Sequence, residues 1–308
     1  MKGGRGLDTV HDPELECLDL ERVLRRPLKS QQLLPAHHPG QASYIWRIET
    51  SVSFQIVRTN RFLTPPDEDF WQGSLHLFGA LTTDLTRLAA INRWLQPRVP
   101  WTVPQVHALV PFHGRIFAVL DWVSGDLVPS FDHLTPEALR VFGAALARLH
   151  QCHFPVFGPL ALQDDLSRGI PAAQFSERFR STQQFLQERF YPDEPLAQAD
   201  HDFVFEGPMA PMMLDMDPSQ FLTSNSSIRA LVDTELYVIG PPQLELVGLE
   251  YLLSAESARA FAEGYATIAP LPPLRPVRHA FRRLLRALSF QGPVPWETWM
   301  AWPTRFPT

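Results

Sequence analysis

The amino-acid sequence predicts an α+β protein of two lobes, strand-rich in its first third and mainly helical in the remainder. Residues 44–49 and 52–56 alternate between apolar and polar side chains, as strands with one buried face do. Residues 135–149 and 175–190 instead place apolar side chains three and four positions apart, as amphipathic helices do. The change from the first pattern to the second along the chain predicts the two lobes.

The length and composition suit two packed lobes with a substantial core. The chain has 308 residues, of which 45% are hydrophobic and 19% are charged. We expect an N-terminal, strand-rich lobe over residues 1–122, which includes an N-terminal extension over 1–40. A helical C-terminal lobe is expected over residues 123–308.

The N-terminal elements follow from pattern and from turn residues. We expect an amphipathic piece within 12–34 that Pro27 limits, an antiparallel pair of strands over 44–49 and 52–56, a helix over 80–95, and strands over 106–110 and 116–120. Residues 111–114 supply the turn between the last two strands. Counting along the strand from Phe54 places Arg58 on the same face as Ile56.

The C-terminal elements begin after a polar, glycine-containing connector over 121–126. Thr135 can cap the next helix, and Pro136 suits its first position. The remaining expected elements are the helix over 175–190, a hairpin of 221–222 and 230–233 that turns at 223–227, and helices over 254–268 and 276–290.

Charge, hydropathy and cysteine usage exclude several classes of function. The formal net charge is −6 and the chain has no long basic run, so we expect no nucleic-acid partner. No run of about 18 apolar residues occurs, so we expect no membrane partner and a cytoplasmic protein. Cys17 and Cys152 stand in unrelated contexts, which argues against a zinc site or a disulfide framework. The sequence predicts nothing about the oligomeric state.

The run over residues 213–222 carries the most chemistry. It reads Met-Leu-Asp-Met-Asp-Pro-Ser-Gln-Phe-Leu, and Asp233 follows Asp215 by 18 residues, at the end of the second strand of the hairpin. This series resembles the aminoglycoside phosphotransferase and choline kinase-like families. These families carry His-Gly-Asp-x-x-x-x-Asn in a loop, then a strand pair, then an aspartate. Asp215, Gln220 and Asp233 fall on the three polar positions of that pattern.

Other segments extend the resemblance over roughly residues 40–300. Residues 146–150 and 157–160 resemble the family's Leu-Ala-x-Leu-His helix and the loop after it. Residues 240–246 resemble its Gly-Asp-Pro-x-x-Asp-Leu stretch, and residues 120–125 resemble its hinge between lobes. The resemblance implies a protein-kinase-like bilobal fold, with the catalytic loop in the C-terminal lobe.

The resemblance also implies a role for each matched residue, with ATP and Mg²⁺ as cofactors. Asp215 would orient the acceptor hydroxyl and take its proton, while Asp233 and Gln220 would hold magnesium through oxygen atoms. Arg58, in place of the usual lysine, would contact the phosphates. The hinge residues expected to bind the nucleotide are Leu120, Asp121, Trp122 and Val123.

The chain departs from the family pattern at several positions. Met213 and Leu214 replace the histidine and glycine before Asp215. Residues 50–53, which we assign to the phosphate-covering loop, contain no glycine, and the helix over 80–95 offers only Asp84 as an acidic partner for Arg58.

Three hypotheses remain open at this point. The first is an ATP-dependent small-molecule phosphotransferase whose acceptor is a hydroxyl of a sugar, an aminoglycoside or an amino alcohol. The second is a catalytically impaired pseudokinase that acts as a binding or scaffold module, and the third is an unrelated α+β protein. Four acidic residues, Glu235, Glu250, Glu256 and Glu263, either bind a cationic acceptor or lie on the surface.

Overall fold

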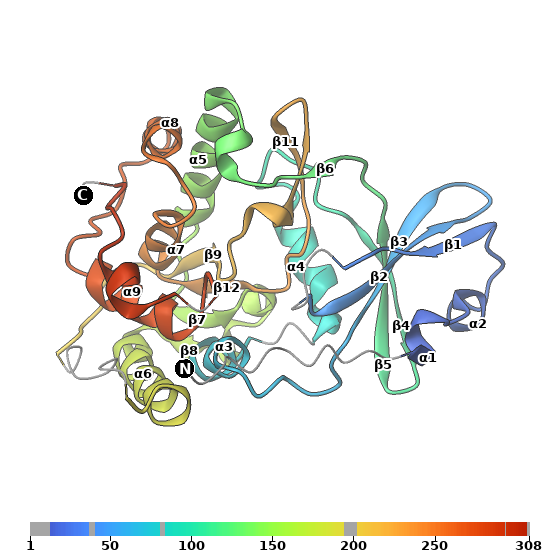
Figure 1. Cartoon of the computed structure of the whole chain (residues 1–308), viewed down its shortest axis with the longest axis horizontal. Helices are drawn as coiled ribbons and strands as arrows, with labels where there is room; N and C mark the ends of the chain where they lie inside the picture. The colour runs from blue at the N-terminus through green and yellow to red at the C-terminus, as the bar shows by residue number, and fades with distance from the viewer. Residues whose placement is uncertain (1–12, 37–40, 81–83, 194–201, 293, 307–308) are drawn as a thin grey trace.

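A five-stranded antiparallel sheet stands beside a larger helical body in the computed structural model (Figure 1), which describes residues 13–36, 41–80, 84–193, 202–292 and 294–306. Its strands are β1 (Ser30–Leu33), β2 (Ser43–Glu49), β3 (Phe54–Asn60), β4 (Val106–Phe112) and β5 (Arg115–Asp121), in the spatial order β1-β2-β3-β5-β4. The predicted strand pair is confirmed as β2 and β3, with Glu49 opposite Phe54.

The two faces of the sheet are covered by different elements. One face buries Trp46, Val57 and Phe117 against the short helices α1 (Pro13–Glu16) and α2 (Leu20–Leu24). The opposite face packs on the 3₁₀ turn Leu85–Arg87 and on α4 (Leu88–Leu95), which lies between the sheet and the helical body (Figure 1). Burial of apolar surface on both faces fixes the register of the strands.

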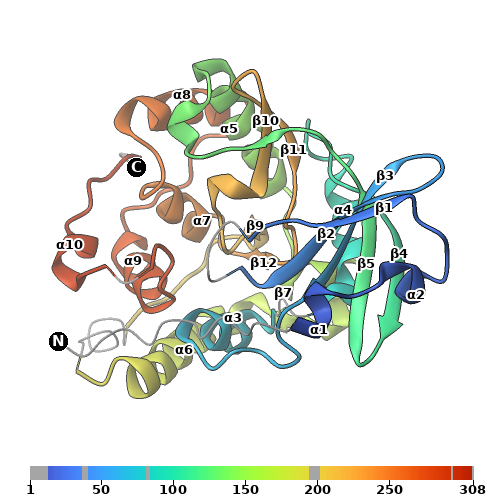
Figure 2. The ribbon, with the colours of Figure 1, turned by 45° about the vertical axis from the view of Figure 1, so that its right-hand side comes forward.

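The segment between β3 and β4 differs from the sequence prediction. The helix expected over 80–95 is shorter, because Asp84 caps the 3₁₀ turn at Leu85 and α4 begins only at Leu88. Residues 81–83 lie outside the described part of the chain. An additional helix, α3 (Asp69–Phe78), precedes it and lies beside α6 (Phe175–Phe190) of the helical body in both ribbon views (Figure 2).

The helical body is built from long helices and short strands. Its helices are α5 (Pro136–His150), α6, α7 (Pro242–Leu249), α8 (Ala255–Ala266), α9 (Arg278–Ala287) and α10 (Trp296–Met300). Its strands are β6 (Asp126–Leu127), β7 (Val156–Pro159), β8 (Ile170–Pro171), β9 (Ala210–Met213), β10 (Phe221–Ser224), β11 (Ser227–Leu231) and β12 (Tyr237–Gly240). Five further 3₁₀ turns span Phe131–His133, Leu160–Asp164, Leu166–Arg168, Ala172–Gln174 and Pro218–Gln220.

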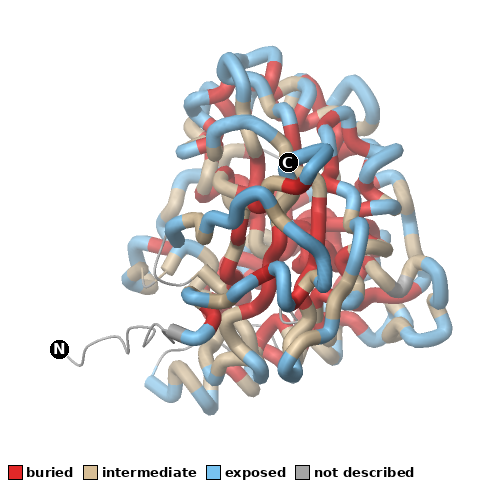
Figure 3. Tube along the Cα trace, turned by 90° about the vertical axis from the view of Figure 1, so that its right-hand side faces the viewer, coloured by how far each residue is buried: buried red, intermediate tan, exposed pale blue. Residues whose placement is uncertain are grey.

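The predicted hairpin and C-terminal helices are present, whereas the four-stranded sheet β8-β7-β12-β9 was not expected from the sequence. Helix α7 is buried along its whole length, so it shows no amphipathic period that could reveal it. The buried trace runs through the middle of the molecule, with exposed loops around it (Figure 3). The two-lobed α+β plan is confirmed by this arrangement.

Two close contacts hold α8 on α5. A Cβ atom at Gly143 would lie 2.0 Å from the carbonyl oxygen of Phe261, and one at Gly264 would lie 1.9 Å from that of Arg140. The absence of side chains at these two positions therefore allows the two backbones to touch.

The end of the described chain is tied into the helical body by Glu250. This side chain is fully buried and accepts hydrogen bonds from the backbone amides of Arg305 and Phe306, at 3.0 and 3.2 Å. Arg282 and Arg278 also pair with it, at 2.9 and 3.2 Å. Among the described helices, none is long and apolar enough to cross a bilayer.

Candidate active site

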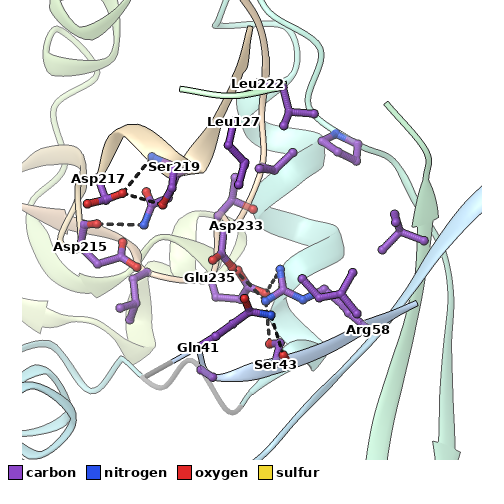
Figure 4. Close-up of a pocket in the computed structure, with 18 of the residues that line it drawn as sticks. Gln41, Ser43, Arg58, Leu127, Asp215, Asp217, Ser219, Leu222, Asp233 and Glu235 are labelled. Carbon is purple, nitrogen blue, oxygen red and sulfur yellow. Dashed lines mark hydrogen bonds and ion pairs between the residues drawn. The ribbon is translucent and has the colours of Figure 1, made fainter. Parts of the chain in front are cut away.

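A pocket of about 1000 Å³ lies between the five-stranded sheet and the helical body (Figure 4). Arg58, Asp215, Gln220 and Asp233 all line it. The predicted nucleotide-binding residues Leu120, Asp121, Trp122 and Val123 line the same pocket. The structure therefore brings every site residue named from the sequence into one cavity, although β3 and the loop after β9 are far apart in the chain.

The loop that carries Asp215 begins where β9 ends, and a buried network supports it. The backbone amide of Met213 donates to Glu245 Oε1 at 2.7 Å. The other oxygen of Glu245 lies 2.7 Å from His150 Nε2, and His150 Nδ1 lies 3.0 Å from the hydroxyl of Tyr265. A buried polar network holds its members rigidly when every hydrogen-bond partner is present. This network therefore fixes the start of the Asp215 loop relative to α5 and α7.

Two local interactions shape the loop after Asp215. Asp217 accepts from the amide and the hydroxyl of Ser219, which stabilises the turn at Pro218. The side-chain amide of Gln220 donates to the backbone carbonyl of Asp215 at 2.8 Å. Gln220 Oε1 and Asp215 Oδ1 are buried, and neither has a hydrogen-bond partner among the described residues. Two oxygen atoms are thus left to accept from, or coordinate, a bound group.

The surroundings of Asp215 favour its protonated form. Burial raises the pKa of this carboxyl group to about 8, and the negative charge of Asp233 acts in the same direction. The nearby amide of Gln220 opposes the shift. A carboxyl group whose pKa lies near neutral pH can exchange a proton with a reacting hydroxyl.

Asp233 lies just after β11 in an unusual backbone conformation. Its φ angle is 59°, in the left-handed region that few residues other than glycine adopt. Its side chain is 52% exposed and faces the pocket (Figure 4). Thr234 donates from its hydroxyl to Asn92 Oδ1 of α4, which holds the backbone beside Asp233 in place.

Arg58 on β3 reaches across the pocket to this same segment. Its Nη2 lies 2.9 Å from Asp233 Oδ1 and donates to Ser43 Oγ at 2.9 Å, while its Nη1 lies 2.7 Å from Glu235 Oε1. Burial lowers the pKa of Arg58, but Glu235 and Asp233 outweigh that effect and leave it above its ordinary value. The guanidinium is therefore a fixed positive charge inside the pocket.

The acidic partner of Arg58 was not identified from the sequence. Asp84 pairs with Arg87 at 2.8 Å instead, so the suggestion that it might serve Arg58 is wrong. Glu235 had been considered only as a contact for a cationic acceptor or as a surface residue. No sequence pattern could have found it, because Asp233 adopts a left-handed backbone and the residues after it form a turn, so the strand period does not apply there.

The other acidic residues considered for a cationic acceptor lie elsewhere. Glu250 is buried with Arg278 and Arg282, Glu263 pairs with Arg140, and Glu256 is exposed. None of these three lines the described pocket.

Two side chains of the connector have partners on the neighbouring strands. Asp121 directs its carboxylate toward β4, where Oδ1 lies 2.6 Å from His107 Nε2 and Oδ2 accepts from the amide of Gln105. Both oxygen atoms of this side chain thus already have partners in the N-terminal sheet region. Trp122 stacks against Arg47, whose guanidinium carbon lies 5.5 Å from the ring centroid.

The loop over residues 50–53 is not the one that covers the pocket. It is the turn between β2 and β3, in which Thr50 and Ser53 bond to each other, and it does not line the described pocket. The connection from β1 to β2 does, through Leu34, Gln41 and Ala42. Strand β1 is mostly polar and exposed, so its sequence lacks the alternation that reveals a strand. Residues 37–40, which include Gly40, lie outside the described part of the chain.

A further wall of the pocket was missed because α3 was not predicted. Phe70 and Trp71 at the start of α3 line the pocket together with residues 289–291, which follow α9. Asp69 Oδ2 accepts from Ser289 Oγ at 2.6 Å and so joins the two segments. The wall they form is largely aromatic, with neutral polar side chains beside the rings.

The oxygen atoms that line the pocket fit magnesium bound jointly with a substrate better than a metal ion that protein side chains alone surround. Among the described residues, three or more His, Cys, Asp or Glu side chains nowhere gather as a metal-binding group. The pocket instead offers the half-exposed Asp233 and the unpartnered oxygen atoms of Asp215 and Gln220. Magnesium is commonly bound by one or two carboxylates together with the phosphates of a substrate, which is what this set provides.

Comparison with known proteins places the chain in one group. A profile of the phosphotransferase enzyme family matches residues 78–281. No curated protein matches the chain.

Similar solved structures share the fold at low sequence identity. The macrolide 2'-phosphotransferase MphH from Brachybacterium faecium is 14% identical, with a TM-score of 0.59 over 88% of this chain and 89% of that one. The GDP and kanamycin complex of APH(2")-IIia is 14% identical, with a TM-score of 0.58 over 88% of each chain. Aminoglycoside phosphotransferase APH(4)-Ia, in a complex with AMP-PNP and hygromycin B, is 14% identical, with a TM-score of 0.55 over 91% of this chain and 90% of that one.

Proposed function

The chain belongs to the phosphotransferase enzyme family, and from that premise we propose that it transfers a phosphoryl group from ATP to a hydroxyl group of a small molecule. The protein-kinase-like, two-lobed fold that it shares with its structural neighbours agrees with this reaction. The family match excludes the hypothesis of an unrelated α+β protein and gives no support to a non-catalytic pseudokinase. The proposal places the reaction in the cytoplasm. It also places the boundary between the N-terminal and C-terminal lobes between residues 122 and 123.

The observation that carries the proposal is the convergence of the predicted residues on one pocket. Arg58 comes from the sheet, whereas Asp215, Gln220 and Asp233 come from the helical body. Phosphoryl transfer needs little covalent chemistry from the protein, so positioning and neutralisation of charge account for most of the catalysis. A pocket that combines a fixed cation, an acid of raised pKa and oxygen ligands supplies both.

Each residue takes the role that its surroundings favour. Asp215, with its pKa near 8, accepts the proton of the acceptor hydroxyl as that oxygen attacks the terminal phosphorus of ATP. Arg58 holds the phosphates from the sheet side. Leu120 to Val123 would hold the adenine, for which the side chains of Leu120 and Trp122 offer apolar surface.

Asp233 and Gln220 would hold Mg²⁺ through a carboxylate and an amide oxygen. When bound, the ion neutralises charge on the phosphates. Asp233 has the exposure needed for this role, and its left-handed backbone is held by Thr234 and Asn92. Strained residues at pockets persist where the surrounding structure fixes them, as it does here.

The resemblance and the neighbours, which include macrolide and aminoglycoside phosphotransferases, support the acceptor class that we propose. We propose a hydroxyl of a sugar, an aminoglycoside, an amino alcohol or a related compound. Phe70, Trp71 and Phe290 offer flat apolar surfaces on which a ring can pack.

The test is a nucleotide titration followed by an acceptor panel. Calorimetry should detect Mg·ATP binding to the wild-type chain, and a coupled ADP assay should detect turnover with at least one acceptor of the proposed classes. Asp215→Asn should lower kcat by roughly 10²–10⁴-fold with little change in nucleotide binding. Glu263→Gln, which alters an exposed ion pair far from the pocket, is the matched control. Absence of any binding at millimolar Mg·ATP would eliminate the proposal.

A further inference from the structure

Glu235 has no role in the function proposed above, yet it is the most buried carboxylate that faces Arg58. Its side chain is only 4% exposed, whereas that of Asp233 is 52% exposed. Both carboxylates approach the same guanidinium, from residues two apart in the chain (Figure 4). The two acids are therefore placed for different tasks, one inside the protein and one at the open side of the pocket.

We propose that Glu235 is a positioning residue, which holds the Arg58 guanidinium at the phosphate position. This inference rests on the proposed phosphotransferase function. Three N–H contacts of Arg58 are accounted for by Asp233, Ser43 and Glu235. A guanidinium has five N–H groups, so donors remain for a phosphate while the side chain is held.

Geometry separates this role from that of a metal ligand. The carboxylate that anchors Mg²⁺ must reach the nucleotide phosphates in the open pocket, because magnesium keeps much of its shell from water and substrate. The Glu235 carboxylate instead lies against Arg58 at 2.7 Å and is almost inaccessible to solvent. Asp233 retains the exposed position that a ligand needs.

Helix α4 contributes a neutral side chain, and no carboxylate, to the region around Arg58. Its sequence, LAAINRWL, contains no acid. Its Asn92 accepts from the hydroxyl of Thr234, and its Nδ2 donates to the carbonyl of Pro104 at 2.8 Å. Helix α4 thus fixes the backbone between Asp233 and Glu235, and the acid on the buried side of Arg58 comes from residue 235 rather than from α4.

The experiment compares nucleotide binding by Glu235→Gln, Arg58→Met and the double variant. Mg·ADP affinity should fall about 10–100-fold in each single variant, as for the loss of a charge-assisted contact. The double variant should be no weaker than Arg58→Met alone, because Glu235 acts through the guanidinium. Glu263→Gln should bind Mg·ADP as the wild type does. A wild-type chain that binds no nucleotide would instead sink the proposed function, which separates the two failures.

Two other results would overturn the inference. The first is wild-type Mg·ADP affinity in Glu235→Gln together with weakened binding in Arg58→Met. The second is a raised Mg²⁺ requirement in Glu235→Gln that Arg58→Met lacks, since this would make Glu235 a metal ligand. Glu235→Asp keeps the charge on a shorter side chain. Glu235→Asp should retain more Mg·ADP affinity than Glu235→Gln. If Glu235→Gln does not fold, Glu235→Asp replaces it in the experiment, and its Mg·ADP affinity should fall at least threefold.

Discussion

At the scale of single residues, the pocket is defined by where its charges are buried. Asp215 is an acid held close to another acid, whereas Arg58 is a cation held between two carboxylates. The sequence pointed to Asp215, Asp233, Gln220 and Arg58 through their resemblance to the motif series of a known family, and all four line one pocket. It did not identify the partner of Arg58, since pairing across the pocket depends on how the sheet and the helical body meet.

Replacement of Asp215 should stabilise the protein at alkaline pH. Because its folded pKa of about 8 lies above the unfolded value of about 3.9, its stabilising effect is fully present below pH 4 and is lost as pH rises to 8. Asp215→Asn should therefore unfold with a free energy on the order of 1 kcal/mol higher than the wild type at pH 8.5. Urea unfolding at pH 5 and pH 8.5 measures this, with Glu256→Gln as an exposed control. A variant that is less stable than wild type at pH 8.5 would contradict it.

The pH dependence of turnover should report the same carboxyl group. A general base must be ionised to accept a proton, so kcat/KM for the acceptor should rise with pH up to about 8 and then level off. Below that value it should fall roughly tenfold per pH unit. Initial rates over pH 5.5–9 at fixed Mg·ATP provide the measurement. A profile that is flat across pH 6–8 would show that Asp215 is not the group that titrates.

At the scale of elements, prediction succeeded where burial imposes a period. Strands β2 and β3 and helices α5 and α6 carry a strand or helix period in their apolar residues and were expected from the sequence. Strand β1 is polar because it lies at the sheet edge, and α7 is buried on all sides, so neither carries an interpretable period. Because β1 was not predicted, β2 and β3 became the first predicted hairpin of the sheet. The turn between them was therefore assigned to the pocket in place of the connection from β1 to β2.

The contact between α5 and α8 depends on its two glycines. Gly143→Ala and Gly264→Ala should each lower the free energy of unfolding by about 1–3 kcal/mol, since the new methyl group would meet backbone atoms that cannot move alone. Thermal unfolding measures the change. Gly248→Ala is the matched helical control, because there the methyl group meets only side chains, the nearest atom being in the ring of Phe290 at 3.2 Å. Equal losses at all three positions would mean that the helix contact is not the cause.

At the scale of the whole molecule, the pocket lies between two bodies, the sheet and the helical body, that few segments of the chain connect. Arg58 and Asp233 are 175 positions apart in the chain, and their ion pair crosses from the sheet to the helical body. A ligand that bridges the same space adds to the attachment of the two bodies. The two-lobed plan could be predicted from the sequence, whereas the aromatic wall formed by α3 and residues 289–291 could not, since it arises only when distant segments meet.

Nucleotide should therefore raise the stability of the whole chain. At a Mg·ATP concentration 100 times its dissociation constant, the stabilisation should be about 2.7 kcal/mol. Differential scanning fluorimetry should show a higher Tm with Mg·ATP than with ATP plus a chelator. Asp233→Ala should lose the part that depends on magnesium, while Glu263→Gln should keep it. An equal shift with and without magnesium in the wild type would count against a metal at Asp233.

The contacts with Glu250 make Arg305 and Phe306 part of the packed helical body rather than a loose segment. Deleting residues 305–308 removes both backbone donors that Glu250 Oε1 uses, and a buried carboxylate would remain short of partners. Such a shortened chain should lose about 3 kcal/mol of unfolding free energy, much as a core mutant does. Arg305→Ala keeps the amide and should cost far less. Loss of these two backbone contacts would thus destabilise the helical body from within, without touching a residue of the pocket.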